Sequence, residues 1–479
     1  MNRHSVFVLC VGAMIASTSA SAQNAPVTRR AADYCAKLLS LRLPDVKITS
    51  ASPVDPATVR MQGVSVRHCQ VAGVIGKEIQ FVVRLPDDWN QRFFMGGGGG
   101  FVGSVSHNAE SSLNSGYATA GTDTGHEGNP LDASWALDNP ERQVNFGFVA
   151  VHRTAEVAKA IVRDYYGSDA QHSYFLGCSN GGRQGLVEAL RYPDDFDGIV
   201  SVAPALDFTG VATSFVRNGQ AAFRAEGNAV KPVVTPANLT LLQAKVLETC
   251  DLNDGVKDGV IENPGACNFK VASIRACPAD RSGADCLTRA QRTAIEAIYS
   301  PTTAGGKQVY PGQPFGGEAE ESGWSSWITG PSPLAETLTK GKASTAQLAF
   351  GVDMYRYFVF DDAKWNYRTY DLSKWAKDTK RAATILNATS ADLSAYKASK
   401  GKLILVHGWS DAALSARSTI DYYEQLRAHD AAVRDYTALY LLPGVQHCAG
   451  GAGPDQVDWY SVISAWAEHD EAPDRVIAS

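Results

Sequence analysis

The sequence predicts an α/β fold with a mostly parallel sheet, helices on both faces and one large insertion. Short apolar segments typical of strands alternate with amphipathic helical segments over about residues 78–205, as expected for a parallel α/β sheet. This alternation fades over 206–395 and returns over 396–479. We therefore expect one α/β domain, formed by 23–205 and 396–479, that a second domain at 206–395 interrupts.

The elements before the insertion follow in order from their residue patterns. Five short apolar segments predict strands, at 78–85, 92–95, 117–120, 173–176 and 198–202. The helix predicted at 154–165 carries an apolar stripe that includes Ala158, Ile161 and Val162. A second helix is predicted at 183–191, because Tyr192-Pro193 ends it.

The insertion itself has a different composition. It contains four cysteines and many aromatic residues, among them Trp324, Trp327, Tyr355, Tyr357, Phe358, Phe360 and Trp365. After it, the α/β pattern resumes with a strand at 402–406, a helix at 415–428 and a strand at 436–442.

Composition and charge exclude several classes of protein. A chain of 479 residues with 44% hydrophobic and 20% charged residues is not a disordered chain, a collagen or a coiled coil. Its 44 basic and 50 acidic residues give a formal charge of −6. Because no basic excess is present to neutralise phosphates, we do not expect a nucleic-acid partner.

The first residues have the layout of a secretory signal peptide. A polar start with Arg3 precedes an apolar run from Val6 to Ala16, and Ala20-Ser21-Ala22 forms a small-residue cleavage site. The alternative is a buried N-terminal helix. We expect residues 1–22 to be removed, and the mature protein to be secreted or periplasmic without a membrane segment.

The cysteines agree with export. Loss of Cys10 with the signal peptide leaves an even number: Cys35, Cys69, Cys178, Cys250, Cys267, Cys277, Cys286 and Cys448. An even number in an oxidising compartment favours a full set of disulfides, although spacing alone leaves the pairing open.

Ser179 is the candidate nucleophile. Gly177-Cys178-Ser179-Asn180-Gly181 has the form G-x-S-x-G between a predicted strand and a predicted helix, where a sharp turn exposes the serine hydroxyl. The alternative is a structural turn.

A serine nucleophile needs a base, and the base needs an orienting acid. In the chain order Ser, acid, His, Asp411 follows the strand at 402–406 and His447 follows the strand at 436–442. Other candidates fit these strand ends less well: Asp421, Asp430 and Asp435 as the acid, and His429 and His469 as the base.

Together these segments resemble the tannase and feruloyl esterase family, which includes mono(2-hydroxyethyl) terephthalate hydrolases. The matching segments are 89–101, 177–183, 250–260, 407–411 and 443–448. The resemblance implies an α/β-hydrolase fold in which 206–395 forms a lid domain. It also implies hydrolysis of esters of aromatic acids.

Two backbone N–H groups should stabilise the oxyanion of such a reaction. One should belong to Asn180, directly after the nucleophile, and the other to the loop Gly96–Gly100. The resemblance points to Gly100 within that loop. The alternative for the glycine run is a flexible turn.

The segment from Asp251 to Val260 concentrates carboxylates, which hard cations such as Ca²⁺ prefer together with carbonyl oxygens. It is not an EF-hand, because its glycine is misplaced and the final Glu is missing. The resemblance implies a structural calcium site in the lid, held by Asp251, Asp254 and Asp258 and by the carbonyls of Val256 and Val260. The alternative is a solvated acidic turn.

The resemblance also implies four disulfides, namely Cys178–Cys448, Cys35–Cys69, Cys250–Cys267 and Cys277–Cys286. The first pair flanks the proposed nucleophile and base, so a Ser179–His447 contact would bring the two cysteines together. The alternative for this pair is two buried free thiols.

These observations predict a serine esterase that acts on small aromatic esters of the hydroxycinnamic type and needs no organic cofactor. The alternatives are a terephthalate monoester hydrolase or a tannase. The resemblance implies that terephthalate monoester hydrolases carry a lid arginine that pairs with the free carboxylate of the substrate. In the stretch 350–365 Arg356 is the one candidate for this role, and it is not clearly in register. A different class is an inactive hydrolase fold that binds polyphenols or carbohydrates.

Overall fold

The structure is a computed structural model that describes residues 33–59, 61, 63–105, 109–226, 229–330 and 345–479. The predicted signal peptide, with Cys10, lies outside the described residues. No helix in the described part of the chain is long and apolar enough to cross a membrane.

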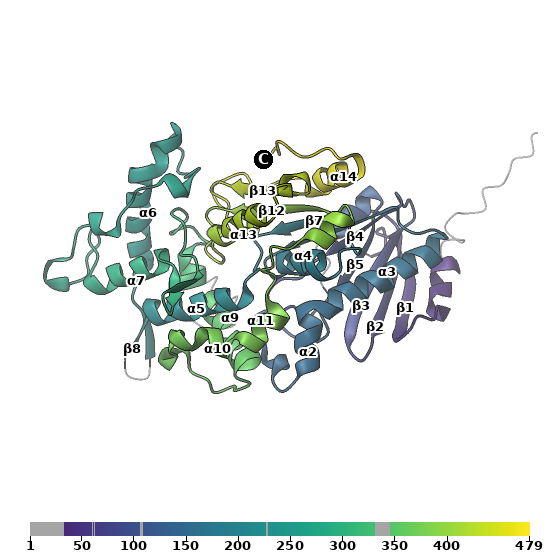
Figure 1. Cartoon of the computed structure of the whole chain (residues 1–479), viewed down its shortest axis with the longest axis horizontal. Helices are drawn as coiled ribbons and strands as arrows, with labels where there is room; N and C mark the ends of the chain where they lie inside the picture. Colours follow the sequence, from purple (N-terminus) through teal and green to yellow (C-terminus); the bar gives the residue numbers. More distant parts are fainter. Residues whose placement is uncertain (1–32, 60, 62, 106–108, 227–228, 331–344) are drawn as a thin grey trace, which may run out of the picture.

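The centre of the molecule is a nine-stranded sheet with the order β1-β2-β3-β5-β4-β6-β7-β12-β13 (Figure 1). Its strands are β1 (Val46–Val54), β2 (His68–Ile75), β3 (Ile79–Pro86), β4 (Arg92–Gly96), β5 (Ala118–Thr122), β6 (His172–Cys178), β7 (Gly198–Val202), β12 (Lys402–Gly408) and β13 (Thr437–Leu442). The strands from β5 to β13 pair in parallel, and β1, β2, β3 and β5 pair antiparallel. The predicted mostly parallel α/β sheet is confirmed.

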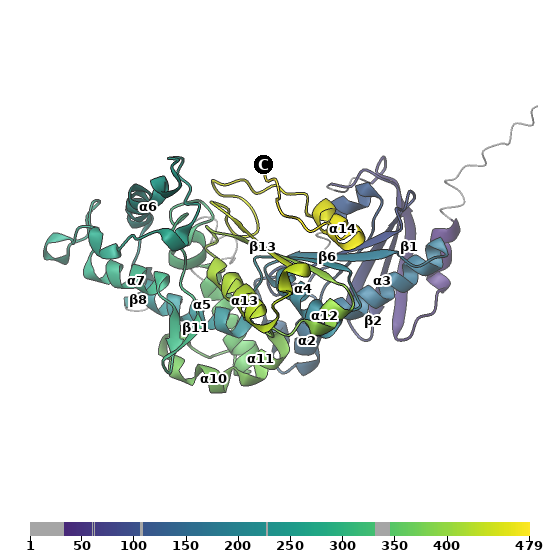
Figure 2. The ribbon, with the colours of Figure 1, turned by 45° about the horizontal axis from the view of Figure 1, so that its top comes forward.

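Helices cover both faces of this sheet (Figure 2). Apolar side chains of α3 (Ala150–Tyr166), α4 (Asn180–Arg191) and α13 (Ala416–His429) share one core with the sheet, and α14 (Trp459–His469) packs in another. In α3, Ala158, Ile161 and Val162 are fully buried, as the apolar stripe predicts. The short helix α2 (Pro140–Val144) precedes a π-helical turn at Asn145–Val149 and then α3.

The segment 206–395 adds no strand to this sheet within its described residues. It consists of short helices and two hairpins and lies largely at one end of the molecule (Figure 1). Its helices are α5 (Phe208–Ala222), α6 (Pro236–Cys250), α7 (Arg289–Tyr299), α9 (Ala346–Met354), α10 (Trp375–Asp378) and α11 (Lys380–Leu386), and its hairpins are β8 (Phe223–Glu226)–β9 (Ala229–Pro232) and β10 (Thr302–Ala304)–β11 (Lys307–Tyr310). The short helix α12 (Ser394–Ala398) crosses the end of this segment.

Strand register brings the candidate site together. Cys178 at the end of β6 is paired with Val202 of β7, and Val202 is paired with Val406 of β12. Gly408, at the end of β12, is paired with Leu442 of β13. Because parallel strands end at the same edge of a sheet, the residues that follow β6, β12 and β13 emerge side by side.

Candidate active site

Ser179 occupies a sharp turn between β6 and α4. Its φ of 62° and ψ of −120° lie in a region that non-glycine residues rarely adopt, and such strain is typical of functional turns. A Cβ on Gly177 would lie 2.4 Å from the backbone of Gly181, and a Cβ on Gly181 would lie 3.1 Å from Gly97. A side chain on Gly177 would clash with the backbone, and one on Gly181 would press tightly against Gly97, so both positions favour glycine, as the G-x-S-x-G pattern predicts.

Asp411 and His447 meet in the loops after β12 and β13. His447 Nδ1 and Asp411 Oδ2 are 2.8 Å apart. The other oxygen, Asp411 Oδ1, accepts the backbone N–H groups of Ala413 and Leu414, each at 2.8 Å. These two bonds fix the carboxylate, so it can hold the His447 ring in one orientation.

Electrostatics keep Asp411 ionised. Burial alone would raise the pKa of Asp411, but His447 and His407 beside it hold that pKa well below its ordinary value. Opposite charge and hydrogen bonds to the ionised form outweigh desolvation here. Asp411 can therefore serve as a permanent anion next to His447.

His407 is a functional candidate that the sequence pattern did not single out. Its side chain is fully buried, and its Nε2 lies 3.2 Å from Asp411 Oδ2 and 3.2 Å from the Leu414 carbonyl oxygen. Both partners are acceptors, so Nε2 carries a proton. The other ring nitrogen lies 2.7 Å from Thr419 Oγ1. The four-residue spacing of His407 and Asp411 across a turn was the available signal.

Ser179 and His447 line the same cavity, although no hydrogen bond joins their side chains within the described structure. Such bonds are often long in ligand-free enzymes and tighten when the substrate binds. The alternative acids and bases lie elsewhere. None of the following lines this cavity: Asp421, Asp430, Asp435, His429 and His469.

The glycine loop presents its last two residues to the cavity. Gly97 N–H donates to the Leu176 carbonyl at 2.8 Å, and Gly98 N–H donates to Gln184 Oε1 at 2.9 Å. Gly99 and Gly100 line the cavity with Asn180, and neither glycine N–H has a hydrogen-bond acceptor among the described residues. Gly100 adopts a φ of +56°, and a Cβ there would lie 2.3 Å from the Pro130 carbonyl oxygen.

The cavity has a volume of about 560 Å³ and is mainly apolar. One side of it consists of the glycine loop, Ser179, Asn180 and His447, and the insertion supplies the facing wall. That wall contains Phe208, Val211, Ala212, Phe215, Trp327 and Phe350. The ring centroids of Trp327 and His447 are 5.1 Å apart. Several aromatic rings next to one polar cluster suit a flat aromatic ligand.

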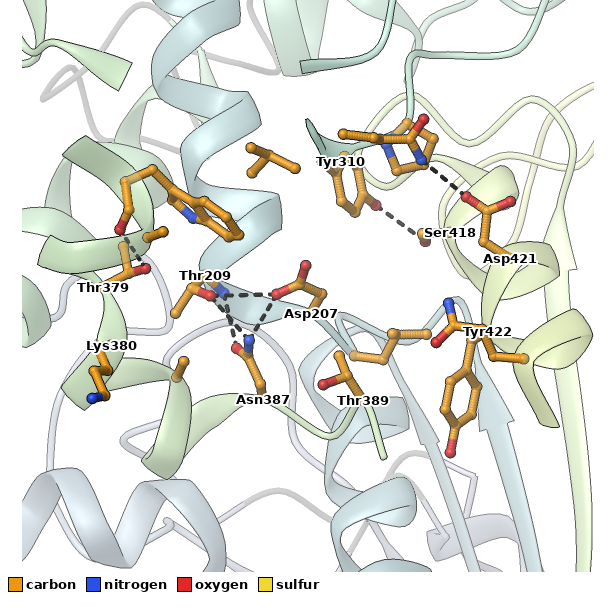
Figure 3. A pocket seen from close by; sticks show the side chains of 18 residues that line it. Asp207, Thr209, Tyr310, Thr379, Lys380, Asn387, Thr389, Ser418, Asp421 and Tyr422 are labelled. Carbon is orange, nitrogen blue, oxygen red and sulfur yellow. Dashed lines mark hydrogen bonds between the residues drawn. The ribbon is translucent and has the colours of Figure 1, made fainter. Parts of the chain in front are cut away.

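A second cavity of about 510 Å³ is lined by Asp207 and Thr209 at the N-terminus of α5 (Figure 3). Asp207 caps α5 by accepting Gly210 N–H at 3.0 Å, and it also accepts Asn387 Nδ2 at 2.8 Å. Asn387 Nδ2 donates to Thr209 Oγ1 as well. This network ties the start of α5 to the chain after α11, and it thereby fixes Phe208 in the wall of the Ser179 cavity.

Among the described residues four disulfides are present, and they are the four pairs that the resemblance implies: Cys178–Cys448, Cys35–Cys69, Cys250–Cys267 and Cys277–Cys286. The Cys178–Cys448 bond joins the residue before Ser179 to the residue after His447, with a Cα–Cα distance of 5.9 Å. Both cysteines line the cavity.

The predicted calcium ligands lie in the segment 251–260 directly after α6, where Asp251 is buried and Asp254, Val256 and Asp258 are exposed. Asp251, Asp254 and Asp258 each accept one backbone N–H through Oδ1, from Gly259, Val256 and Val260 respectively. Each carboxylate thus keeps its other oxygen for a ligand, and the Val256 and Val260 carbonyls accept no hydrogen bond from described residues. All five donors are hard oxygens, which suits Ca²⁺. The three carboxylates do not all converge within 4.8 Å. Among the described residues, His152, Glu188 and Asp195 form the one group of three such side chains whose potential ligand atoms lie within 4.8 Å of one another.

Known proteins resemble this chain over nearly its whole length. A family model described as "Tannase and feruloyl esterase" matches residues 64–479. Mono(2-hydroxyethyl) terephthalate hydrolase of Piscinibacter sakaiensis is 32% identical, with 90% of this chain and 81% of that protein covered. Feruloyl esterase B of Aspergillus niger is 27% identical, with 92% and 91% covered.

A solved structure agrees with these relatives. The crystal structure of feruloyl esterase B from Aspergillus oryzae matches with a TM-score of 0.81 at 26% identity, and the match covers 93% of this chain and 92% of that chain. The predicted α/β-hydrolase fold is confirmed. The chain belongs to the tannase and feruloyl esterase family of ester hydrolases.

Proposed function

We propose that this chain is a secreted serine esterase that hydrolyses esters of aromatic, hydroxycinnamic-type acids. The observation that carries the proposal is the cavity in which Ser179 and His447 face aromatic side chains of the insertion, with Asp411 bonded to His447. A hydroxyl, an imidazole and a buried carboxylate in this order perform acyl transfer in serine hydrolases.

In the proposed reaction Ser179 Oγ attacks the ester carbonyl while His447 Nε2 takes its proton. Asp411 holds the imidazole in the required tautomer and stabilises the imidazolium that forms. The N–H groups of Gly100 and Asn180 stabilise the tetrahedral oxyanion. His447 then gives its proton to the leaving alcohol, and water hydrolyses the acyl-enzyme by the reverse sequence.

The cavity lining favours a neutral aromatic ester over a terephthalate monoester. No lysine or arginine lies among the described residues that line the cavity, so a free carboxylate on the acid would be desolvated without a counter-charge. Arg356 does not line the cavity either, and its Nε donates to the Trp365 carbonyl at 3.2 Å. Tannase and terephthalate monoester hydrolase remain the alternatives.

A substrate panel tests this specificity. We expect the highest kcat/KM for methyl ferulate, with lower values for methyl gallate and for mono(2-hydroxyethyl) terephthalate. A highest value for the terephthalate monoester would contradict the argument from the lining, and a highest value for the gallate would favour a tannase.

We further propose that 206–395 forms a lid domain over the 23–205 and 396–479 catalytic domain, with a structural Ca²⁺ ion in the lid. The ion would be held by Asp251, Asp254 and Asp258 with two backbone carbonyls, away from Ser179. Binding would draw the three carboxylates closer together, and it would supply charge neutralisation rather than chemistry.

Calcium removal should lower the melting temperature, because a metal that binds only the folded state stabilises it by about 2.7 kcal/mol at a hundredfold excess over Kd. We expect EDTA to lower the melting temperature, Ca²⁺ to restore it, and Asp254→Ala to be less stable and insensitive to EDTA. Calorimetry with and without chelator measures this. An unchanged melting curve after exhaustive chelation, with no calcium in elemental analysis, would contradict the site.

Loss of the Cys178–Cys448 bond should impair catalysis. The bond spans 270 positions, and the chain-entropy model gives an upper figure of about 5.6 kcal/mol for so long a loop. In a Cys178→Ala/Cys448→Ala variant, Ser179 and His447 are no longer tied together. We expect a kcat lower by about tenfold or more with little change in KM, because misplacement of reacting groups slows chemistry.

The matched control for this variant is Cys277→Ala/Cys286→Ala, which removes a short disulfide that does not line the cavity. It should lose some stability and keep its kcat. A folded Cys178→Ala/Cys448→Ala protein with wild-type kcat would show that the bond does not position the catalytic groups.

Secretion is proposed from the signal-peptide pattern of residues 1–22. Four disulfides fit an oxidising compartment. N-terminal sequencing of exported protein should begin at Gln23, and a mature chain that retains residue 1 would contradict the cleavage.

A further inference from the structure

Arg183 is a fully buried guanidinium in the first turn of α4, four residues after Ser179. Its Nε donates to Asn180 Oδ1 at 2.8 Å. Its terminal nitrogens donate to three main-chain carbonyls, those of Phe146, Gly147 and Leu386, at 2.9–3.1 Å. Every acceptor is a neutral oxygen.

The charge of Arg183 has no acidic partner in the part of the chain that the structure describes. Buried arginines are rarely left without a carboxylate, because an unpaired charge in the interior is costly. Burial, together with the smaller effect of the positive charge on Arg191, lowers the pKa of Arg183 to about 9. Its hydrogen-bond acceptors are neutral dipoles, and the guanidinium also lies over the rings of Phe146 and Phe208.

Arg183 lies directly behind the wall of the Ser179 cavity. Two of its neighbours, Asn180 and Phe208, line that cavity, and the guanidinium carbon lies 5.5 Å from the Phe208 ring centroid. It is also at the N-terminal end of α4, where the helix dipole is positive. Two positive features therefore lie behind the place where an oxyanion would form.

Arg183 also belongs to a chain of contacts that holds the glycine loop. Asn180 Oδ1 accepts from Arg183, and Asn180 Nδ2 donates to the Gly98 carbonyl at 3.1 Å. The Gly98 N–H in turn donates to Gln184 Oε1. The side chain of Asn180 therefore sets the position of the loop relative to its own backbone N–H, and Arg183 sets the side chain of Asn180.

We propose that Arg183 is a positioning residue of the oxyanion hole, and that its unpaired charge favours the anionic tetrahedral intermediate over the neutral bound ester. The inference rests on the proposed serine-esterase function. A neutral ester gains little from a buried cation, whereas a developing oxyanion gains more, and only such a difference raises kcat. The absence of a carboxylate partner then has a function, because a carboxylate paired with Arg183 would cancel the positive potential of its guanidinium at the oxyanion.

The first experiment compares Arg183→Met, which removes the charge at similar volume, with Arg183→Lys, which keeps it. We expect Arg183→Met to lose about 10²-fold in kcat with KM nearly unchanged, the size of effect of one oxyanion donor. Arg183→Lys should recover at least tenfold of that loss. Circular dichroism and thermal melting establish that each variant is folded.

Inhibitor binding separates electrostatics from general damage to the site. An aryl boronic acid, which forms an anionic tetrahedral adduct on the serine, should bind Arg183→Met more weakly by about the same factor as kcat/KM falls. A neutral aromatic amide that only occupies the cavity should bind both proteins alike. Equal weakening of both inhibitors would overturn the proposal.

A second pair of variants keeps the proposal testable if Arg183→Met does not fold. Asn180→Asp and Asn180→Ala both remove the amide donor to Gly98, but only the Asn180→Asp substitution gives Arg183 a carboxylate partner. We expect the Asn180→Asp variant to be the more stable of the two and to have a kcat at least tenfold below that of Asn180→Ala. Equal kcat values would overturn the proposal.

Failure of this inference and failure of the proposed function are distinguishable. If Ser179→Ala retains wild-type activity, the serine mechanism itself is wrong. If Ser179→Ala is inactive while folded Arg183→Met keeps the wild-type kcat, the role of Arg183 alone is wrong.

Discussion

Replacement of Ser179 by alanine is expected to lower kcat for an aryl ester by about 10⁶-fold, the loss seen when a serine nucleophile is removed from a complete triad. The physical reason is that no other described hydroxyl lies in the turn between β6 and α4 that faces His447 in the cavity. KM should change little, because the apolar lining that binds the acid remains. Hydrolysis of a chromogenic aryl ester by the purified variant measures the effect.

Alanine at this position removes one oxygen and leaves the backbone N–H of Asn180 in place. The residual rate should therefore stay above that in water, by the contribution of binding and the oxyanion donors. A Ser179→Ala protein that hydrolyses the ester at nearly the wild-type rate would show that the reaction uses another nucleophile.

Asp411→Asn is expected to lower kcat by about 10⁴-fold without unfolding the protein. An asparagine oxygen can still accept the N–H groups of Ala413 and Leu414, which turns the amide NH₂ toward His447 Nδ1. Nδ1 must then act as the acceptor, so the proton moves to Nε2. An imidazole in this tautomer cannot take the proton of Ser179.

Asp421→Asn is the matched control, because Asp421 lies in α13, is hydrogen-bonded to Gln308 and lines the second cavity (Figure 3). It was an alternative acid in the sequence, and its variant should keep the wild-type kcat. A large loss in Asp421→Asn, or wild-type activity in Asp411→Asn, would mean that the acid has been assigned to the wrong residue.

The sequence was most informative where chemistry restricts residue types. The turn around Ser179 admits only small neighbours, so the G-x-S-x-G pattern located the turn. The helix after it was predicted to begin at Arg183, whereas α4 begins at Asn180. Asp411 and His447 were predicted because parallel strands end at one edge, and the structure places both residues there with a 2.8 Å contact. The parallel strands were predicted because they are short, apolar and bounded by turn residues.

Other features depend on three-dimensional contacts, which the spacing of apolar residues along the sequence does not reveal. β1 and β2 were not predicted. β1 is largely exposed and mixes polar residues with Pro53, which hides its strand pattern. The contact of His407 with Asp411 requires the chain to turn back on itself within four residues. The environment of Arg183 depends on Leu386, which lies 203 positions away in the insertion.

The glycine loop shows which part of the oxyanion hole could be predicted from the sequence. The run Gly96–Gly100 predicts a close backbone approach, but it does not say which N–H is left without an acceptor. In the structure Gly97 and Gly98 donate elsewhere, and this leaves Gly99 and Gly100 at the cavity. Only three-dimensional packing makes that distinction.

The central claim is that Ser179 is an activated nucleophile in an esterase, and its chief rival from another class is an inactive hydrolase fold that binds polyphenols or carbohydrates. Titration with a fluorescent aryl phosphonate, followed by peptide mapping, tests this claim most directly. We predict one label per molecule on Ser179, loss of ester hydrolysis in proportion to labelling, and no label on Ser179→Ala. A wild-type protein that is folded and binds aromatic ligands but takes up no label on Ser179 would contradict the account and favour the binding protein.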